Sequence, residues 1–200
     1  GTDLDGTIVA HYGFISERTK IAFTAAYKAG IHMYFVTGRP IRWMVEIKEN
    51  FGFGTGICAN GALLYDFNNE KVLEEWLFPV DAQLETVKRL RQVLPNVSFA
   101  VEIGKDFNRE KKYVPRWDVG QDNVGVDKIE EVITKPALKM LARCGNGEYS
   151  SDEMLEIATK ELQGIASPTH SNISDSLLEI SADGVSKGAT LSKIAARHGL

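Results

Sequence analysis

Apolar runs alternate with helix-like patterns along the first part of the chain. Residues 31–36 form an apolar run that predicts a buried strand, and residues 57–59 predict a shorter one. Ahead of the first run, Ser16 can cap a helix that continues to about Lys28, and Gly30 follows its end. If a strand also precedes this helix, the three elements form a βαβ unit, whose two strands we expect to be parallel neighbours.

The segments that follow continue the α/β pattern. Pro40 suits the first turn of a helix that reaches about Asn50. Residues 62–65 and 72–76 flank the Asn-rich stretch 66–70, which predicts a β-hairpin. Near the other end of the chain, two further predicted elements are a strand at 177–180 and a helix at 187–198.

The intervening segment, residues 79–176, is far too long for one crossover connection. We interpret it as an α+β domain inserted into a Rossmann-like α/β core with a parallel sheet, formed by residues 1–78 and 177–200. One larger mixed sheet is the alternative. The inserted segment is predicted to contain a helix from Asp81 to about Leu94, a half-exposed strand at 97–103, an irregular stretch at 104–127, a strand at 136–143, and a helix capped by Ser150 with Glu153 and ending near Leu162.

Composition narrows the class of protein. The chain has 200 residues, of which 44% are hydrophobic and 25% charged, as is typical of a soluble globular protein. The formal net charge of −4 provides no basic field for nucleic acid. Two distant cysteines suggest no disulfide framework, so we expect a reducing, cytoplasmic setting. No apolar run is long enough to span a bilayer. Because no coiled-coil pattern stands out, we expect a monomer by default.

The chemistry of the chain is concentrated first in its opening residues, which read Asp3-Leu4-Asp5-Gly6-Thr7. In an extended backbone, residues two apart point the same way, so the two aspartates can face one pocket from a strand end. Their carboxylates repel each other unless a cation lies between them, and oxygen ligands suit Mg²⁺. We therefore expect a metal site at Asp3 and Asp5, with an ordinary surface turn as the alternative.

Two later stretches end at the same expected edge of the sheet. Thr37 and Gly38 follow the apolar run, and Lys187 opens the last predicted helix. The Thr37 hydroxyl, backbone N–H groups near Gly38 and the Lys187 ammonium at a helix N-terminus can bind phosphate, although a strand-end turn and a surface lysine are the plainer readings. Asn60 and Gly61 are either substrate contacts or a left-handed turn, and Arg39 is either a substrate contact or solvated.

The inserted segment carries a mixed basic and aromatic patch that includes Arg116. Such side chains can hold a phosphorylated sugar or nucleotide by charge and stacking, while a solvated loop is the alternative. The patch comprises Arg109, Lys111, Lys112, Tyr113, Arg116 and Trp117.

Together, Asp-Leu-Asp-Gly-Thr, Val-Thr-Gly-Arg and the late Lys-Gly pair resemble, in this order, the motifs of the haloacid dehalogenase (HAD) superfamily of phosphatases. The segments 59–62 and 184–191 look like its Cof-like subfamily, which has a large cap. The resemblance implies that Asp3 is the nucleophile and forms an aspartyl-phosphate, and that Asp5 is first an acid and then a base. It also implies Mg²⁺ held by the Asp3 side chain and the Asp5 backbone carbonyl, and phosphate bound by Thr37, Gly38 and Lys187.

The leading hypothesis is therefore a Mg²⁺-dependent phosphatase that hydrolyses a small phosphate ester, such as a sugar phosphate or nucleotide. A phosphotransferase or phosphomutase, and a non-catalytic Mg²⁺ or phosphate-binding protein, are the alternatives. The family's fourth motif, Gly-Asp-x-x-Asn-Asp, does not follow Lys187. We expect this motif, with the remaining acidic metal ligands, to lie beyond Leu200, and further strand residues to precede Gly1. The sequence leaves the physiological substrate open.

Overall fold

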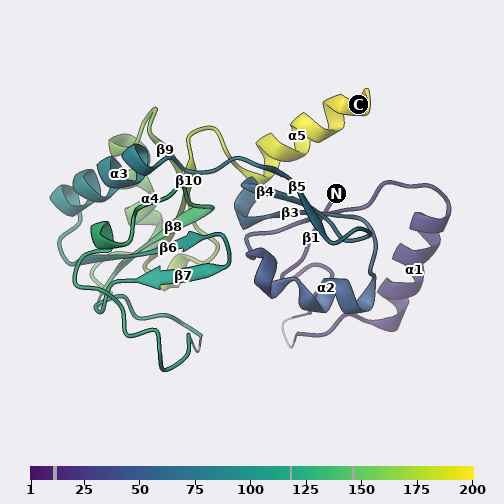
Figure 1. Cartoon of the computed structure of the whole chain (residues 1–200), viewed down its shortest axis with the longest axis horizontal. Helices are drawn as coiled ribbons and strands as arrows, with labels where there is room; N and C mark the ends of the chain where they lie inside the picture. The colour runs from purple at the N-terminus through teal and green to yellow at the C-terminus, as the bar shows by residue number, and fades with distance from the viewer. Residues whose placement is uncertain (11–12, 118, 146) are drawn as a thin grey trace. The chain divides into compact units, whose positions relative to one another are not determined.

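A computed structural model describes residues 1–10, 13–117, 119–145 and 147–200 of the chain. These residues form two compact units, one made of Gly1–Trp76 with Val185–Leu200 and the other of Leu77–Gly184. Figure 1 follows the chain through both, from β1 (Thr2–Asp3) near the N-terminus to α5 (Lys187–Arg197) near the C-terminus. Each unit has its own five-stranded sheet, so the alternative of a single larger sheet is wrong.

The sheet of the first unit has the order β1-β2-β3-β4-β5. β1 and β2 are parallel neighbours, as the predicted βαβ unit requires, and β3 lies parallel to β2. The predicted hairpin is present, because β4 and β5 pair antiparallel. The strands are β1 (Thr2–Asp3), β2 (Tyr34–Val36), β3 (Thr55–Cys58), β4 (Leu63–Asp66) and β5 (Lys71–Glu75).

A side-chain cap explains where the first helix of this unit begins, whereas the second has none. The hydroxyl of Ser16 accepts a hydrogen bond from the backbone N–H of Thr19 at 3.2 Å, which caps α1 as predicted. The helix predicted from Pro40 is broken, because the buried residue Met44 leaves helical geometry between a 3₁₀ turn and α2. The elements are α1 (Glu17–Lys28), the 3₁₀ turn η1 (Ile41–Trp43), α2 (Val45–Asn50), the 3₁₀ turn η2 (Ala59–Gly61) and α5 (Lys187–Arg197).

Alternation along β2 builds a core on each face of the first sheet. Phe35 points to one face, where its ring centroid lies 6.2 Å from that of Phe23 in α1 and 5.2 Å from that of Phe51 at the end of α2. Val36 points to the other face and packs with Ile57 and with Ile194 of α5. α2 and α5 consequently lie on opposite sides of this sheet (Figure 1).

The second unit is an antiparallel sheet with two helices packed against each other and against its strands. The capping box predicted at Ser150 and Glu153 is present. The strand order is β7-β6-β8-β10-β9. The elements are α3 (Val80–Val93), β6 (Val97–Ile103), β7 (Asp106–Arg109), β8 (Lys139–Cys144), α4 (Ser151–Glu161), β9 (Ala166–Thr169) and β10 (Leu177–Ala182), with 3₁₀ turns η3 (Ile129–Glu131) and η4 (Ile173–Asp175).

Three expectations for this region need correction. The strand predicted at 177–180 for the core is β10, which pairs with β8 and β9 in the second sheet, so the chain returns to the first unit only at Val185. β6 is not half-exposed, because it lies between β7 and β8 and even Ser98 and Glu102 are buried. The stretch 104–127 is not wholly irregular, since it contains β7.

Candidate functional site

The acidic turn follows the end of β1. Asp3 is the last residue of this strand, and the next residue, Leu4, is fully buried. The Leu4 carbonyl accepts hydrogen bonds from the N–H groups of Thr7 at 3.1 Å and Val9 at 2.9 Å. This turn leaves the carboxylates open to solvent, with the Asp3 side chain 46% and the Asp5 side chain 60% exposed.

Lys187 comes from the far end of the sequence to meet this turn. It is the first residue of α5, which is capped by Ser186, whose hydroxyl accepts from Ala189 N–H at 3.1 Å. The Lys187 Nζ donates to Asp3 Oδ1 at 3.1 Å. The structure therefore places a cation and a helix N-terminus beside the first carboxylate, an arrangement suited to an anionic ligand.

Gly61 explains how α5 comes this close to the sheet. Its carbonyl accepts a hydrogen bond from the buried Thr190 hydroxyl at 2.9 Å. Its φ is +104°, and a Cβ at this position would lie 2.5 Å from the Ser186 carbonyl oxygen. The residue has a packing role that the sequence did not predict, because neither Thr190 nor the close backbone approach carries a local signal.

Arg39 is neither solvated nor free. Its Nε lies 3.1 Å from both carboxylate oxygens of Asp5, its Nη2 also donates to Asp5, and its Nη1 donates to Glu46 of α2 at 3.3 Å. The hydrogen bonds to Asp5 raise the pKa of Arg39, against the opposing effect of partial burial. Both sequence readings of Arg39 omitted this pairing, and Glu46 was not predicted as part of the site.

Thr37 and Asn60 form the turns at the ends of β2 and β3. Thr37 is 1% exposed, and its hydroxyl accepts a hydrogen bond from the Arg39 N–H at 3.1 Å. This contact is the one expected if Thr37 only forms a turn at the end of the strand. Gly38 follows it in the same turn and is half-buried. Asn60 has a left-handed backbone, with φ of +59°, and its N–H donates to the Thr37 carbonyl at 3.1 Å. The turn that carries Thr37 is thus tied to the turn that carries Asn60 and Gly61.

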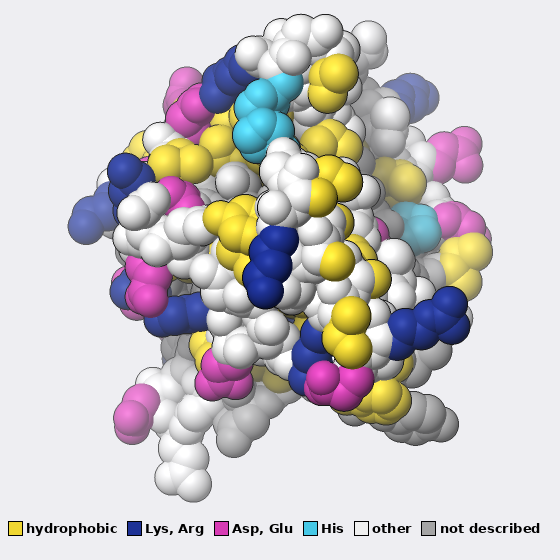
Figure 2. Space-filling view, turned by 90° about the vertical axis from the view of Figure 1, so that its right-hand side faces the viewer, with side chains coloured by type: hydrophobic (Ala, Val, Ile, Leu, Met, Phe, Trp, Pro, Cys, Tyr) yellow, Lys and Arg dark blue, Asp and Glu magenta, His cyan; other side chains and the backbone are white. Residues whose placement is uncertain are grey.

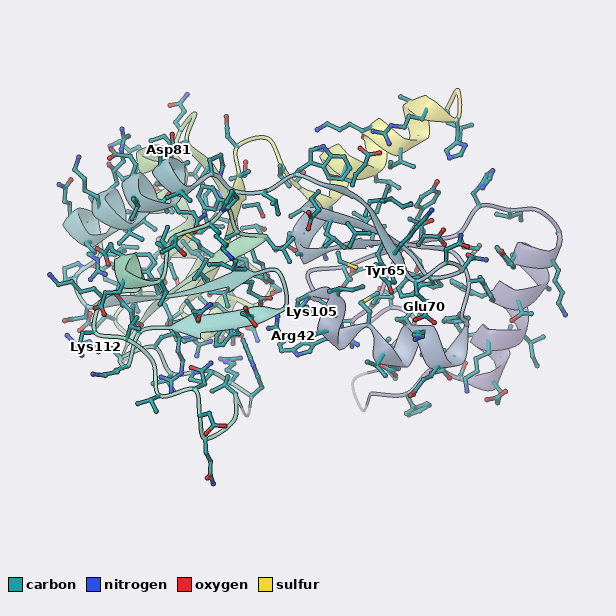
Figure 3. All side chains as sticks on the ribbon, viewed as in Figure 1. Arg42, Tyr65, Glu70, Asp81, Lys105 and Lys112 are labelled. Atoms are coloured by element: carbon teal, nitrogen blue, oxygen red, sulfur yellow. The ribbon has the colours of Figure 1, made fainter. Side chains whose placement is uncertain are left out.

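The patch predicted around Arg116 belongs to the second unit. Arg116 forms an ion pair with Asp175, and Lys111 donates to Asp127 at 2.8 Å. Tyr113 is fully buried, in a cluster with Ala100 and Leu141, so it is not available for stacking on a ligand at the surface. Lys112 is exposed, on the loop that follows β7 (Figure 3).

The two aspartates fit part of a Mg²⁺ site. Carboxylate and carbonyl oxygens are the donors that Mg²⁺ prefers, and Asp3 directs one oxygen to Lys187. Within residues 1–10, 13–117, 119–145 and 147–200, no cluster of three or more His, Cys, Asp or Glu side chains could hold a metal ion. The described residues therefore provide only part of the set of acidic ligands that a Mg²⁺ site needs.

Surface properties add two findings. Figure 2 shows acidic and basic side chains interspersed over one face of the molecule, rather than a continuous basic surface of the kind that binds nucleic acid. None of the helices in the described part of the chain has the length and apolar character needed to span a membrane.

Comparison with known proteins identifies a family that the sequence matches. A family model described as haloacid dehalogenase-like hydrolase matches residues 1–200. Pyridoxal phosphate phosphatase YbhA of Escherichia coli strain K12 is 31% identical over 91 residues, which make up 45% of this chain and 34% of that protein. The matches to curated relatives thus span about a third of their length.

Solved structures share the fold over nearly the whole chain. The HAD subclass IIB sugar phosphatase BT4131 has a TM-score of 0.68 at 19% identity, and SMU.1108c of Streptococcus mutans UA159 has 0.79 at 16%. Each match covers 99% of this chain and 75% of the other. At such identities the likeness shows the fold.

Proposed function

The chain belongs to the haloacid dehalogenase-like hydrolase family, in its Cof-like branch, and from this premise we propose that it is a Mg²⁺-dependent phosphatase of a small phosphorylated molecule. The observation that carries the proposal is the contact between Lys187 Nζ and Asp3 Oδ1 at 3.1 Å. It joins the two ends of the sequence at the end of β1, where a carboxylate nucleophile needs a cation to approach an anionic phosphoryl group.

The reaction follows from the roles of the two aspartates. An Asp3 oxygen attacks phosphorus while the bond to the leaving oxygen breaks, and the protonated Asp5 gives its proton to that oxygen. A water molecule then attacks the aspartyl-phosphate, Asp5 takes the proton from this water, and the bond between Asp3 and phosphorus breaks. Inorganic phosphate leaves, Asp3 is a carboxylate again, and Asp5 has regained its proton.

The remaining groups hold the phosphoryl oxygens. Lys187 and the N-terminus of α5 supply positive charge, and the turn of Thr37 and Gly38 supplies the Thr37 hydroxyl. A Mg²⁺ ion would be held by the Asp3 carboxylate and the Asp5 backbone carbonyl, and when bound it neutralises the charge that develops on the phosphoryl group. We propose that the second unit is the cap that selects the substrate. The names of the relatives make pyridoxal phosphate and sugar phosphates the first candidates.

The test is phosphate release by the full-length natural protein from p-nitrophenyl phosphate, pyridoxal phosphate and hexose phosphates, with Mg²⁺ and with EDTA. We expect metal-dependent turnover that Asp3→Asn abolishes, while circular dichroism shows an intact fold. Asp106→Asn changes an exposed aspartate of β7 in the same way and is the matched control. Full turnover by the Asp3→Asn protein would refute the mechanism. Transfer of phosphate to a sugar hydroxyl in the products would favour the phosphotransferase.

A further inference from the structure

One face of the second sheet carries charged side chains although most of it is enclosed. Side chains of directly paired residues lie on the same face of a sheet, and residues two apart on β8 share that face. Glu102 of β6 pairs with Lys139 of β8, and both residues are at most 4% exposed. We call this surface the polar face, and it includes Ser98, Glu102, Arg109, Lys139, Arg143 and Glu179.

Tyr113 covers part of the polar face. It follows β7, is fully buried, and packs with Ala100 and Leu141, which belong to this face. The guanidinium carbon of Arg143 lies 5.5 Å from the centroid of the Tyr113 ring. Burial raises the pKa of the Tyr113 hydroxyl, Arg143 acts to lower it, and Glu179 acts to raise it further. The hydroxyl is thus close to charged groups of the polar face, and Arg143 is the neighbouring cation.

Three hydrogen-bond donors lie at this contact. They are Nε and Nη2 of Arg143 and the hydroxyl of Tyr113, and all three are enclosed. Among the residues that the structure describes, no group accepts a hydrogen bond from any of them. Nε and Nη2 lie on one edge of the guanidinium, in the paired arrangement that matches two oxygens of an anion. Buried donors without an acceptor are costly, so this arrangement favours a ligand that supplies the acceptors.

The carboxylates of the polar face are engaged by other groups. Glu179 Oε2 accepts a hydrogen bond from Lys139 Nζ, and its Oε1 accepts one from the Ser171 hydroxyl at 2.9 Å. Glu102 lies directly opposite Lys139 on the neighbouring strand. Lys139 is therefore next to both carboxylates, whereas Arg143 lies near the other end of β8.

The polar face carries an excess of positive charge. Arg109 belongs to it through the pairing of β7 with β6. Its guanidinium donates to main-chain carbonyls, which carry no charge, at 3.3 Å to Tyr113 and 2.6 Å to Asn123. Among the described residues of this face, one positive charge therefore remains, and in an enclosed setting it favours an anion. The charged residues counted are Arg109, Lys139 and Arg143 against Glu102 and Glu179.

We propose that Arg143 and Tyr113 form a binding site for a phosphate group, either free or part of a larger molecule. The Nε and Nη2 edge of Arg143 binds two oxygens, and the Tyr113 hydroxyl donates to a third. A phosphate group has an oxygen for each of the three donors, which a carboxylate does not. A water molecule accepts only two hydrogen bonds and leaves the charge unbalanced. Because the donors are enclosed, the segment that carries Tyr113 must open to admit the ligand.

Inorganic sulfate is the first probe, because it is tetrahedral and is neither a substrate nor a product of a phosphatase. In the full-length protein, Trp43→Phe and Trp76→Phe make Trp117 the reporter, since Trp117 packs on the cluster that contains Tyr113. At constant ionic strength, sulfate should change this fluorescence saturably. Arg143→Met should weaken sulfate binding by about 10- to 100-fold, because hydrogen bonds between charged groups are the strong ones.

Three further variants separate binding from folding. Tyr113→Phe keeps the ring and removes one donor, so binding should weaken by about 3- to 10-fold, and this variant carries the test if Arg143→Met fails to fold. Arg143→Lys keeps the charge but loses the paired donors, so its affinity should lie between those of Arg143→Met and the wild type. Arg116→Met removes an arginine that pairs with Asp175 and should bind sulfate like the wild type.

The source of the phosphate group is tested with inorganic phosphate and glucose 6-phosphate in the Asp3→Asn protein. Equal affinity for the two indicates a site for the free anion, and tighter binding of the ester indicates a larger phosphorylated ligand.

Two results would overturn the proposal. One is the lack of a saturable response to all three probes, or an equal response in Arg143→Met. The other is a crystal structure, grown with phosphate, in which water alone contacts the three donors. The site lies within the second unit and does not depend on the proposed phosphatase reaction. A protein that binds sulfate through Arg143 but shows no turnover would refute the proposed function alone.

Discussion

Replacing Gly61 with alanine tests how α5 is held against the first sheet and how Lys187 reaches Asp3. The added Cβ would lie 2.5 Å from the Ser186 carbonyl oxygen, 2.7 Å from its carbon and 2.8 Å from the Thr190 hydroxyl. Two of these neighbours are backbone atoms at the start of α5, which cannot move aside as the tip of a side chain can. The N-terminus of the helix must therefore shift.

The cost has three parts. A non-glycine residue at φ of +104° is strained by about 1 to 3 kcal/mol. Forcing an extra methyl group into a packed site costs about 1 to 3 kcal/mol. Weakening the 2.9 Å hydrogen bond between Thr190 and the Gly61 carbonyl costs about 1 kcal/mol. We expect Gly61→Ala to lower the free energy of unfolding of the first unit by about 3 to 7 kcal/mol, as the sum of these terms.

Urea unfolding followed by the fluorescence of Trp76 measures this loss. Trp76 packs on the cluster that includes Ile194 of α5, and Trp43→Phe and Trp117→Phe remove the other two tryptophan signals. Gly30→Ala is the matched control, because Gly30 has φ of +83° and open space around its Cβ position. It should cost about 1 to 2 kcal/mol from backbone strain alone. Equal losses in the two variants would refute the packing argument.

Two other predictions concern the second unit. Glu110 is 3% exposed, and its carboxylate accepts hydrogen bonds from the N–H groups of Phe99 and Ile129, both at 3.0 Å, and from Arg91. Glu110→Gln turns an amide donor toward these donors and should lower the free energy of unfolding in urea by about 2 to 4 kcal/mol. An unchanged urea midpoint would contradict this role. Burial raises the pKa of Tyr113 from 10.0 to about 12, so between these values the unfolded tyrosine ionises while the folded one stays neutral, and stability should fall as pH rises. Tyr113→Phe should lack this part of the alkaline loss, and identical pH dependence in both proteins would refute the assignment.

Elements that depend on local signals could be predicted from the sequence. The cap at Ser16 and the capping box of Ser150 with Glu153 act within one helical turn, so the sequence alone identifies them. The parallel pair of β1 and β2 follows from the short strand-helix-strand spacing. These features need no knowledge of distant partners.

Features that depend on distant partners could not be predicted in the same way. The apolar run at 177–180 indicates a strand, but nothing within it says that its neighbours are β8 and β9. The alternation in β6 suggests one exposed face, yet Glu102 is buried there. A strand's own pattern reports its period, whereas its burial depends on what covers each face.

The candidate site shows the same division. The order of the motifs predicted that Asp3 and Lys187 lie in one site, and Lys187 Nζ is 3.1 Å from Asp3 Oδ1 in the structure. The pairing of Arg39 with Asp5 and with Glu46 was missed, because Glu46 belongs to α2, which begins only after the helix predicted from Pro40 breaks at Met44. No local pattern in the sequence predicts this break in the helix.

The charges of the site support the proposed role of a divalent cation. When Asp5 is protonated for the first step of the proposed reaction, two carboxylates, those of Asp3 and Glu46, face two cations, Lys187 and Arg39, which leaves no net charge. A phosphate ester that enters this site brings further negative charge close to Asp3, and repulsion between like charges at such distances opposes both binding and attack. The partial positive charge at the N-terminus of α5 is about half an elementary charge, too little to balance the charge of a phosphate ester. A divalent cation on Asp3 would make the net charge of the site positive, so we infer that the metal serves substrate binding as well as the chemical step.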